Sequence, residues 1–249
     1  MRVSIITVCF NSARTIADTL QSVVDQTHAD VEHVIVDGGS SDGTVRIAQN
    51  LGRKGRVVLS ESDKGIYDAM NKGLRLATGE VIGFLNADDM YASSEVLSKV
   101  DMLMQRDELD ALYGDTEFVR PDRLDKPVRR YRSERFKPSR IAWGWMPAHP
   151  ALFLKRSLFE RYGNFHTDYR IAGDFELVAR IFRSGNLSYA YIPEVLVRMR
   201  TGGISTSGLR NTLLLNQEVL RACRENAINS NWIKILSKYP LKLIEFWKK

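Results

Sequence analysis

The stretch "VSIITVCFNSARTIADTLQSVVDQTHADVEHVIVDGG", Val3 to Gly39, decides the fold. Residues 3–10 and 31–37 are apolar runs of strand length that end in polar turn residues. Between them, apolar side chains recur at helical spacing from Ile16 to Val24, and Asn11 or Ser12 can cap the helix. This order is typical of a crossover unit, in which two parallel strands of one sheet are joined by a helix.

The same alternation continues along the chain. Further strands are predicted at 56–61, 81–89, 111–119 and 187–193. Further helices are predicted at 40–52, 65–79, 93–106, 155–163, 174–185 and 212–226. We therefore expect an α/β fold with a mostly parallel central sheet and helices near the C-terminal end.

Composition narrows the class of protein. The 249 residues are 44% hydrophobic and 27% charged, which is ordinary for a soluble globular chain. No run of eighteen apolar residues predicts a transmembrane helix, and the apolar run near the first residue is too short for a signal peptide. The two cysteines have no metal-binding or disulfide spacing, so we expect a reducing cytoplasm.

Positive charge gathers in two segments. Residues 120–140 contain nine Lys or Arg and three acidic residues, an excess equal to the net charge of +6 of the whole chain. Residues 231–249 contain five lysines and one glutamate. Both segments indicate an anionic partner.

Two common nucleotide motifs are missing. The glycine-rich "VDGGSSDGT" follows the second strand, but a dinucleotide fingerprint would need glycine where Ser40 stands. No Gly-Lys-Ser/Thr phosphate loop occurs anywhere in the sequence. A dehydrogenase or a P-loop enzyme is therefore disfavoured.

The polar residues that end the strands are the candidates for function, because ligands bind beyond the carboxyl ends of open parallel sheets. Asp37 can accept hydrogen bonds from a base or a ribose, or it can organise its own turn. Asp88 and Asp89 end the strand "VIGFLNADD", and two adjacent carboxylates repel each other unless a cation lies beside them. Mg²⁺ or Mn²⁺ would suit such oxygen ligands, and the alternative is a solvated turn.

The ordered set of motifs resembles a known family. "TVCFN", "DGGSSDGT", "SESDKGIYDAMNKGL" and "FLNADD" together resemble the inverting family 2 glycosyltransferases of the GT-A fold. "MPAHPALFLKRSLFERYGNF", "YRIAGDFELVARI" and "VRMRTGGIS" are similar to the acceptor half of bacterial members that build surface polysaccharide. The resemblance covers about Val3 to Ser205.

The resemblance implies a Rossmann-like fold of three layers and a single catalytic domain. We expect that domain at residues 1–225, with a nucleotide-sugar and metal half at 1–118 and an acceptor half at 119–225. Residues 226–249 would then form a basic amphipathic tail.

The resemblance also implies roles for the donor-side residues. Asp37 would contact the uracil or ribose of a UDP-sugar, and Asp88 and Asp89 would be the metal-binding carboxylates. Asn86 stands where many relatives have Asp, which leaves open which of the two aspartates binds the metal directly. The expected nucleotide-binding residues are Thr7, Asn11, Asp37, Lys64, Asn71 and Asp88.

On the acceptor side, Asp174 occupies the place of the family's catalytic base and could deprotonate an acceptor hydroxyl. Its alternative role is to cap the helix that follows, and Glu176 is the second candidate for the base. His149 would line the acceptor site or approach the metal. Arg198 and Arg200 would bind a diphosphate, or they would simply be exposed at a strand end.

The expected reaction is a single displacement with inversion, in O-antigen, capsule or exopolysaccharide synthesis. The acceptor would be a saccharide on polyprenyl diphosphate, reached at the inner face of the cytoplasmic membrane. Apolar residues among the tail lysines would lie on that membrane or pack on the domain.

Rival functions remain open at this point. A sugar-phosphate nucleotidyltransferase would need a glycine-rich basic loop after the first strand, which "TVCFNSART" lacks. A nucleic-acid-binding protein could use residues 120–140, and a non-catalytic nucleotide-sugar binder would share the donor motifs. We expect no nucleic acid partner.

Overall fold

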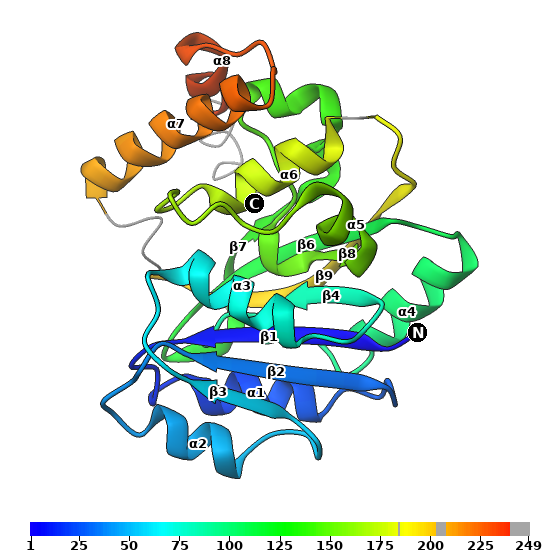
Figure 1. The fold of residues 1–249 in the computed structure, drawn as a ribbon, viewed down its shortest axis with the longest axis vertical. Coiled ribbons are helices and arrows are strands. Elements are labelled where there is room, and N and C mark those ends of the chain that lie inside the picture. Colours follow the sequence, from blue (N-terminus) through cyan, green and yellow to red (C-terminus); the bar gives the residue numbers. More distant parts are fainter. Residues whose placement is uncertain (184, 203–207, 240–249) are drawn as a thin grey trace.

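The computed structural model describes residues 1–183, 185–202 and 208–239. It contains one nine-stranded sheet with helices on both faces, as Figure 1 shows. This confirms the predicted α/β architecture. The last three residues of the quoted "VRMRTGGIS", 203–205, and the tail beyond residue 239 lie outside the described residues.

The first half of the sheet is parallel. Its strands lie in the order β3-β2-β1-β4, with bounds Val57–Ser60, Val31–Asp37, Val3–Cys9 and Val81–Phe84. The connecting helices are α1 (Ile16–Val24), α2 (Thr44–Asn50) and α3 (Ile66–Leu76). Every residue of β1 is buried, which explains its continuous apolar run. Cys9 pairs with Asp37, so β1 and β2 end at the same edge of the sheet.

The second half of the sheet mixes parallel and antiparallel pairs. The order continues from β4 through β8 (Leu152–Lys155), β6 (Ala111–Arg120) and β9 (Tyr189–Arg200) to β5 (Asp89–Tyr91). β9 is parallel to β6, whereas β8 is antiparallel to both β4 and β6, and β5 is antiparallel to β9. The sheet thus runs without a break through both predicted halves, and β6 itself crosses the predicted division at residue 118.

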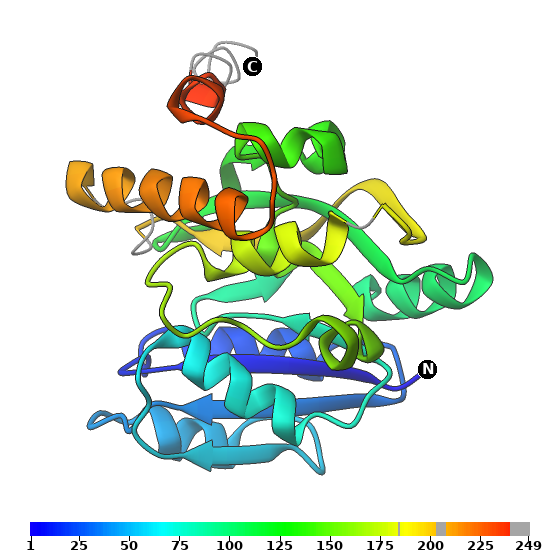
Figure 2. The same ribbon diagram turned by 45° about the horizontal axis from the view of Figure 1, so that its top comes forward.

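Helices cover both faces of the sheet (Figure 2). One face carries α3, α5 (Arg156–Tyr162), α6 (Gly173–Phe182) and α7 (Gly208–Glu225), whose apolar side chains form one large core. The other face carries α1 and α2 and, further along, α4 (Val96–Arg106). The loops at the carboxyl ends of β1, β2 and β3 therefore lead from the sheet into these helices.

The basic segment at residues 120–140 forms regular structure that the periodicity of its sequence did not predict. Residues 123–131 form β7, an edge strand that pairs only with β6 among the described strands. Exposed charges and Pro127 protect that edge from pairing with another chain. Three short 3₁₀ helices follow, η1 (Ser133–Arg135), η2 (Pro138–Trp143) and η3 (His149–Ala151).

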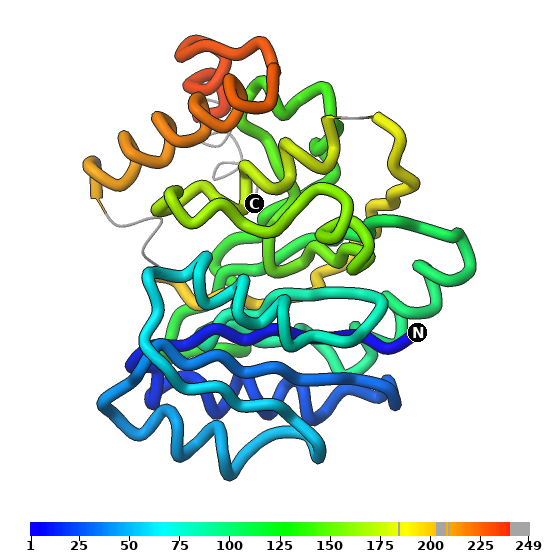
Figure 3. The backbone as a smooth tube through the Cα atoms, in the orientation of Figure 1, coloured from blue at the N-terminus to red at the C-terminus, as the bar shows by residue number. Residues whose placement is uncertain are grey.

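The described part of the predicted tail packs on the domain. Helix α8 (Trp232–Leu236) lies beside α7 and η2, as Figure 3 traces, and its Ile235 is fully buried. The side chain of Asn231 caps the helix by accepting a hydrogen bond of 2.9 Å from the backbone of Lys234. No helix in the described ranges is long and apolar enough to span a bilayer.

Candidate active site

The loops that follow β1 and β2 are tied together. Asn11 adopts a positive φ of 49°, and its side-chain oxygen accepts a hydrogen bond of 3.0 Å from the backbone of Ser41. Asp42 accepts hydrogen bonds of 3.0 and 2.9 Å from the backbones of Ala13 and Thr44. Asn11 and Asp42 therefore organise the carboxyl edge of the sheet.

Asp37 is buried at the end of β2 and holds its turn in place. Its carboxylate accepts hydrogen bonds of 3.0 and 2.9 Å from the backbones of Gly39 and Ser40, and one of 2.8 Å from the hydroxyl of Ser60. Burial acts to raise the pKa of Asp37, but a hydrogen bond from the hydroxyl of Ser40, together with those just named, outweighs it and lowers the pKa. The turn-organising role of Asp37 is thus present, and any contact with a nucleotide would be added to it.

Two of the residues expected to contact the nucleotide have structural roles in the protein. Thr7 is fully buried inside the sheet, where its hydroxyl lies 3.0 Å from Nε2 of His33. The side-chain amide of Asn71 donates to and accepts from the backbone of Phe165, at 2.9 Å each. The polar atoms of both side chains are thus engaged inside the protein, and a nucleotide contact by either residue stays a prediction. Lys64, by contrast, is exposed in the loop before α3.

The turn between β4 and β5 contains buried oxygens without partners. The backbone N–H of Asp89 donates to the carbonyl of Asn86 at 3.0 Å, and the hydroxyl of Thr19 donates to the carbonyl of Asp89 at 2.7 Å. Asp89 is only 2% exposed. One of its carboxylate oxygens and the side-chain oxygen of Asn86 have no hydrogen-bond partner among the described residues.

A positive charge near this turn would stabilise the ionised forms of Asp88 and Asp89. Burial raises the pKa of Asp88, and burial together with the neighbouring Asp88 raises the pKa of Asp89 well above its ordinary value. Unpartnered buried carboxylate and amide oxygens are the donors that a hard divalent cation prefers, so the residues present fit Mg²⁺ or Mn²⁺. The described residues include no cluster of three or more His, Cys, Asp or Glu that could hold a metal.

The predicted arginines lie beside this turn because β5 pairs with the end of β9. Arg200 is buried, donates to the carbonyl of Asp88 at 2.7 Å and forms an ion pair with Asp18. The guanidinium of Arg198 lies 3.7 Å from the carboxylate of Glu117. The structure therefore brings Arg198 and Arg200 next to the two aspartates, which lie about 110 residues earlier in the sequence.

Asp174 lies in the first turn of α6. The N-cap position belongs to Ala172, and the carboxylate of Asp174 accepts a hydrogen bond of 2.8 Å from the backbone of Phe175. Burial raises the pKa of Asp174, and the nearby His149 opposes that rise. Asp174 is thus a partly exposed residue whose raised pKa suits it to accept a proton.

His149 joins the acceptor half to the end of β4. Its ring stacks on Phe84 with centroids 5.3 Å apart, and it meets Phe165 edge-on at 6.0 Å. Burial lowers its pKa, with the charge of Asp174 acting in the opposite direction. Its Nε2 is buried and has no hydrogen-bond partner in the described ranges. His149 and Asp174, predicted separately, are therefore neighbours.

Sequence reasoning missed Tyr67 and Lys72. The hydroxyl of Tyr67 donates to the carbonyl of Ile171 at 2.6 Å, and a Cβ on Gly173 would lie 2.7 Å from its ring. The buried ammonium of Lys72 donates to the carbonyl of Ser62 at 2.7 Å, inside the loop before α3. The only sequence signal was that both occur in the quoted "SESDKGIYDAMNKGL".

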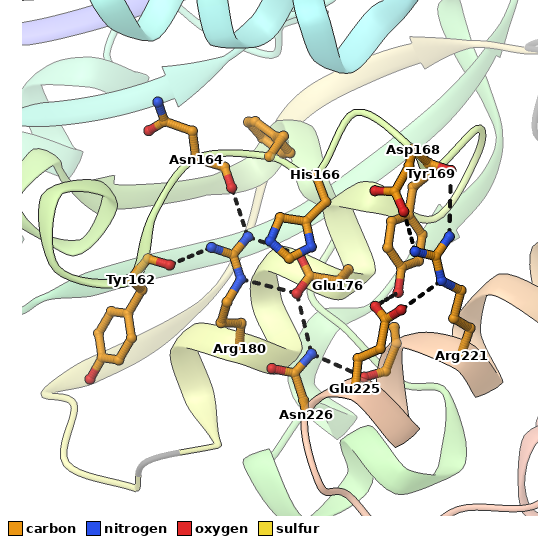
Figure 4. A network of polar contacts seen from close by, with 12 residues as sticks. Tyr162, Asn164, His166, Asp168, Tyr169, Glu176, Arg180, Arg221, Glu225 and Asn226 are labelled. Atoms are coloured by element: carbon orange, nitrogen blue, oxygen red, sulfur yellow. Dashed lines mark hydrogen bonds and ion pairs between the residues drawn. The ribbon is translucent and has the colours of Figure 1, made fainter.

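Glu176 lies in a polar network between α6 and α7 (Figure 4). It makes two contacts of 3.0 and 2.8 Å with Arg180 and accepts a hydrogen bond of 3.2 Å from Asn226. These partners give Glu176 a structural role and leave Asp174 as the better candidate for the base. The same figure shows a second group of ion pairs and hydrogen bonds, formed by Asp168, Tyr169, Arg221 and Glu225.

Comparisons of the sequence find relatives among known proteins. Residues 4–163 match the sequence profile of the family described as "Glycosyl transferase family 2". The chain is 32% identical over 216 residues to the "PGL/p-HBAD biosynthesis glycosyltransferase" of Mycobacterium bovis, covering 85% of this chain and 80% of that protein. It is also 26% identical to an uncharacterized glycosyltransferase of Rickettsia typhi, covering 98% of this chain and 75% of that protein.

Solved structures share the fold. The crystal structure of S. aureus TarS 1-349 in complex with UDP-GlcNAc superposes with a TM-score of 0.72 at 20% identity, covering 93% of this chain and 68% of that chain. The mannosyltransferase PcManGT from Pyrobaculum calidifontis, in complex with GDP-Man and Mn²⁺, superposes with a TM-score of 0.66 at 21% identity, covering 92% and 65%. The chain spans 43% of the longer TarS structure.

Proposed function

The chain belongs to glycosyl transferase family 2 and is a glycosyltransferase, and from this premise we propose that it transfers a sugar from a UDP-sugar to a saccharide hydroxyl with inversion. The observation that carries the proposal is the turn 86–89, where buried oxygens lack partners at the carboxyl edge of a parallel sheet. The UDP-GlcNAc complex of TarS, which shares the fold, supports UDP as the nucleotide.

On the donor side, Asp88 and Asp89 are the proposed ligands of a divalent cation. When bound, the cation would neutralise the charge that develops on the diphosphate leaving group. Asn11, Asp37 and Lys64 lie on adjacent loops and are proposed to contact the nucleotide. The PcManGT structure, which shares the fold and is a complex with GDP-Man and Mn²⁺, supports the use of a divalent metal.

On the acceptor side, Asp174 is the proposed catalytic base. Its carboxylate would take the proton of the acceptor hydroxyl while that oxygen bonds to the anomeric carbon and the bond from that carbon to the UDP oxygen breaks. His149, with an unpartnered Nε2 beside Asp174, would orient the acceptor. Arg198 and Arg200 would supply positive charge beside the diphosphate, with Arg200 holding the backbone of Asp88 in place.

We further propose a lipid-linked acceptor and a peripheral position on the membrane. The exposed basic side chains of β7 and residues 132–140 suit an anionic carrier such as polyprenyl diphosphate. Close by, η2 and α8 expose apolar side chains beside lysines, which suits the interface of an anionic bilayer. Residues 1–225 would then form one catalytic domain in bacterial polysaccharide synthesis, with donor and acceptor halves.

Calorimetric titration with UDP tests the donor site. We expect UDP binding to strengthen at least about tenfold when Mn²⁺ is added, a difference of about 1.4 kcal/mol. Asp88→Asn/Asp89→Asn should lose that gain, because its side chains no longer carry the charge that holds the cation. Asp107→Asn, exposed at the end of α4, is the matched control and should keep it. Equal binding with and without metal, or no binding, would contradict the proposed donor site.

A further inference from the structure

Glu218 on α7 accepts hydrogen bonds from the backbone just before Asp174, the proposed base. The carboxylate of Glu218 accepts three hydrogen bonds of 2.8 Å each, from the backbone N–H groups of Arg170, Ile171 and Ala172. Glu218 is buried, and no lysine or arginine forms an ion pair with it in the described part of the chain. The charge of this carboxylate is therefore compensated by backbone donors of a single loop.

The same loop is held from the opposite side by Tyr67. The hydroxyl of Tyr67 donates to the carbonyl of Ile171, whose own N–H donates to Glu218. The ring of Tyr67 lies against Gly173, where a Cβ would come within 2.7 Å of it. In residues 170–172, the backbone N–H groups are thus held by Glu218 and the carbonyl of Ile171 is held by Tyr67. Asp174 follows two residues after Ala172.

We propose that Glu218 is a positioning residue for Asp174, a proposal that rests on the function proposed above. A buried carboxylate costs free energy unless hydrogen bonds replace its water, so the three N–H groups and Glu218 hold each other in place. Asp174 lies in the first turn of α6, and its direction therefore depends on this loop. A small displacement of a catalytic group lowers the rate strongly, so loss of the hydrogen bonds to Glu218 would reduce turnover.

Glu225 offers a matched control on the same helix. It lies seven residues after Glu218 and accepts hydrogen bonds of 2.6 Å from the hydroxyl of Tyr169 and 2.7 Å from Arg221 (Figure 4). Glu225 thus ties the same loop to α7 through side chains, without holding the backbone of residues 170–172. A purely structural role for the α6–α7 contact would make the two glutamates equivalent.

The test measures the rate at which UDP is released from a UDP-sugar in the presence of acceptor. It compares Glu218→Gln with Glu225→Gln. Glutamine has a single acceptor oxygen, so it cannot receive all three N–H groups. We expect Glu218→Gln to lower kcat at least about tenfold with UDP affinity unchanged. Glu225→Gln should keep kcat within about twofold of wild type. Tyr67→Phe, which removes the opposite hydrogen bond, should lower kcat as well and serves if Glu218→Gln does not fold.

A double-mutant cycle separates positioning of the base from general damage. If Glu218 acts through Asp174, Glu218→Gln should lower the residual turnover of Asp174→Asn by less than about twofold. An equal loss in both backgrounds, or wild-type kcat in both Glu218→Gln and Tyr67→Phe, would overturn the positioning role while leaving the glycosyltransferase proposal intact. Full activity of Asp174→Asn would instead overturn the proposed base.

Discussion

Single residues differ in how their buried charge is compensated. Asp37 is surrounded by hydroxyl and backbone donors, Glu176 is paired with Arg180, and Glu218 is held by three backbone N–H groups. Asp89 is equally buried but retains an unpartnered oxygen among the described residues. Because an uncompensated buried carboxylate is costly, this difference marks Asp89 as the buried acid that fits the proposed cation site, whereas the other three complete the fold.

His33 gives a pH dependence that belongs to one residue. Burial, followed by the charges of Arg56 and Arg53, lowers its pKa to about 3. The unfolded chain binds this proton below about pH 6.5, whereas the native state does not until about pH 3, so stability falls as the pH falls through that window. The contribution is up to about 5 kcal/mol.

Urea unfolding of wild type and His33→Gln between pH 7 and pH 4 measures this contribution. We expect the free energy of unfolding of the wild type to fall more steeply with decreasing pH than that of the variant. The glutamine amide can still bond the hydroxyl of Thr7, which keeps the comparison matched. Parallel pH profiles for the two proteins would exclude His33 as the source.

At the scale of elements, the distance between α3 and the sheet depends on Gly73. A Cβ at that position would lie 2.4 Å from Cγ2 of Ile6 on β1. Gly73→Ala should therefore push α3 outward and destabilise the protein by about 1–3 kcal/mol, despite the better helix propensity of alanine. Thermal and denaturant unfolding measure the effect. Arg75→Ala, exposed on the same helix, should change stability by less than about 0.5 kcal/mol.

The helices and strands that could be predicted are those whose own residues show a clear hydrophobic pattern. The crossover units from residue 3 to residue 84 follow from apolar runs and glycine stops. β8 could not be predicted, because four residues show no period and its place depends on Gly83, where a Cβ would lie 2.8 Å from the ring of Phe153. β5, with three residues, gave equally little signal.

The candidate site divides in the same way. Asp37, Asp88 and Asp89 could be found because strand ends in a parallel sheet share an edge, and Asp174 was found by resemblance. The roles of Tyr67 and Glu218 could not be predicted, because they depend on contacts 104 and 46 to 48 residues away in sequence. The burial of Thr7 could not be predicted either, because a residue near a strand end can still point into the core.

For the whole molecule, η2 and α8 form one exposed surface of apolar side chains. Ile233 is 81% exposed and Trp143 is 42% exposed, with Lys234 beside the ring of Trp143. Ile233→Glu should reduce sedimentation with vesicles that contain anionic lipid at least about threefold, because it places a negative charge at the proposed interface. Met102→Glu, on α4 and 52% exposed in the wild type, is the matched control. Equal sedimentation of both variants and wild type would exclude this surface.

The continuous sheet has a consequence for how substrates are captured. β4 and β6 both pair with β8, so the ladder that joins the strands of the two proposed halves has no hinge. A rigid-body closure of two lobes would break backbone hydrogen bonds in the middle of that ladder. Solvent must therefore be excluded by loop movements over a fixed platform, and small-angle scattering should find the same radius of gyration with and without UDP.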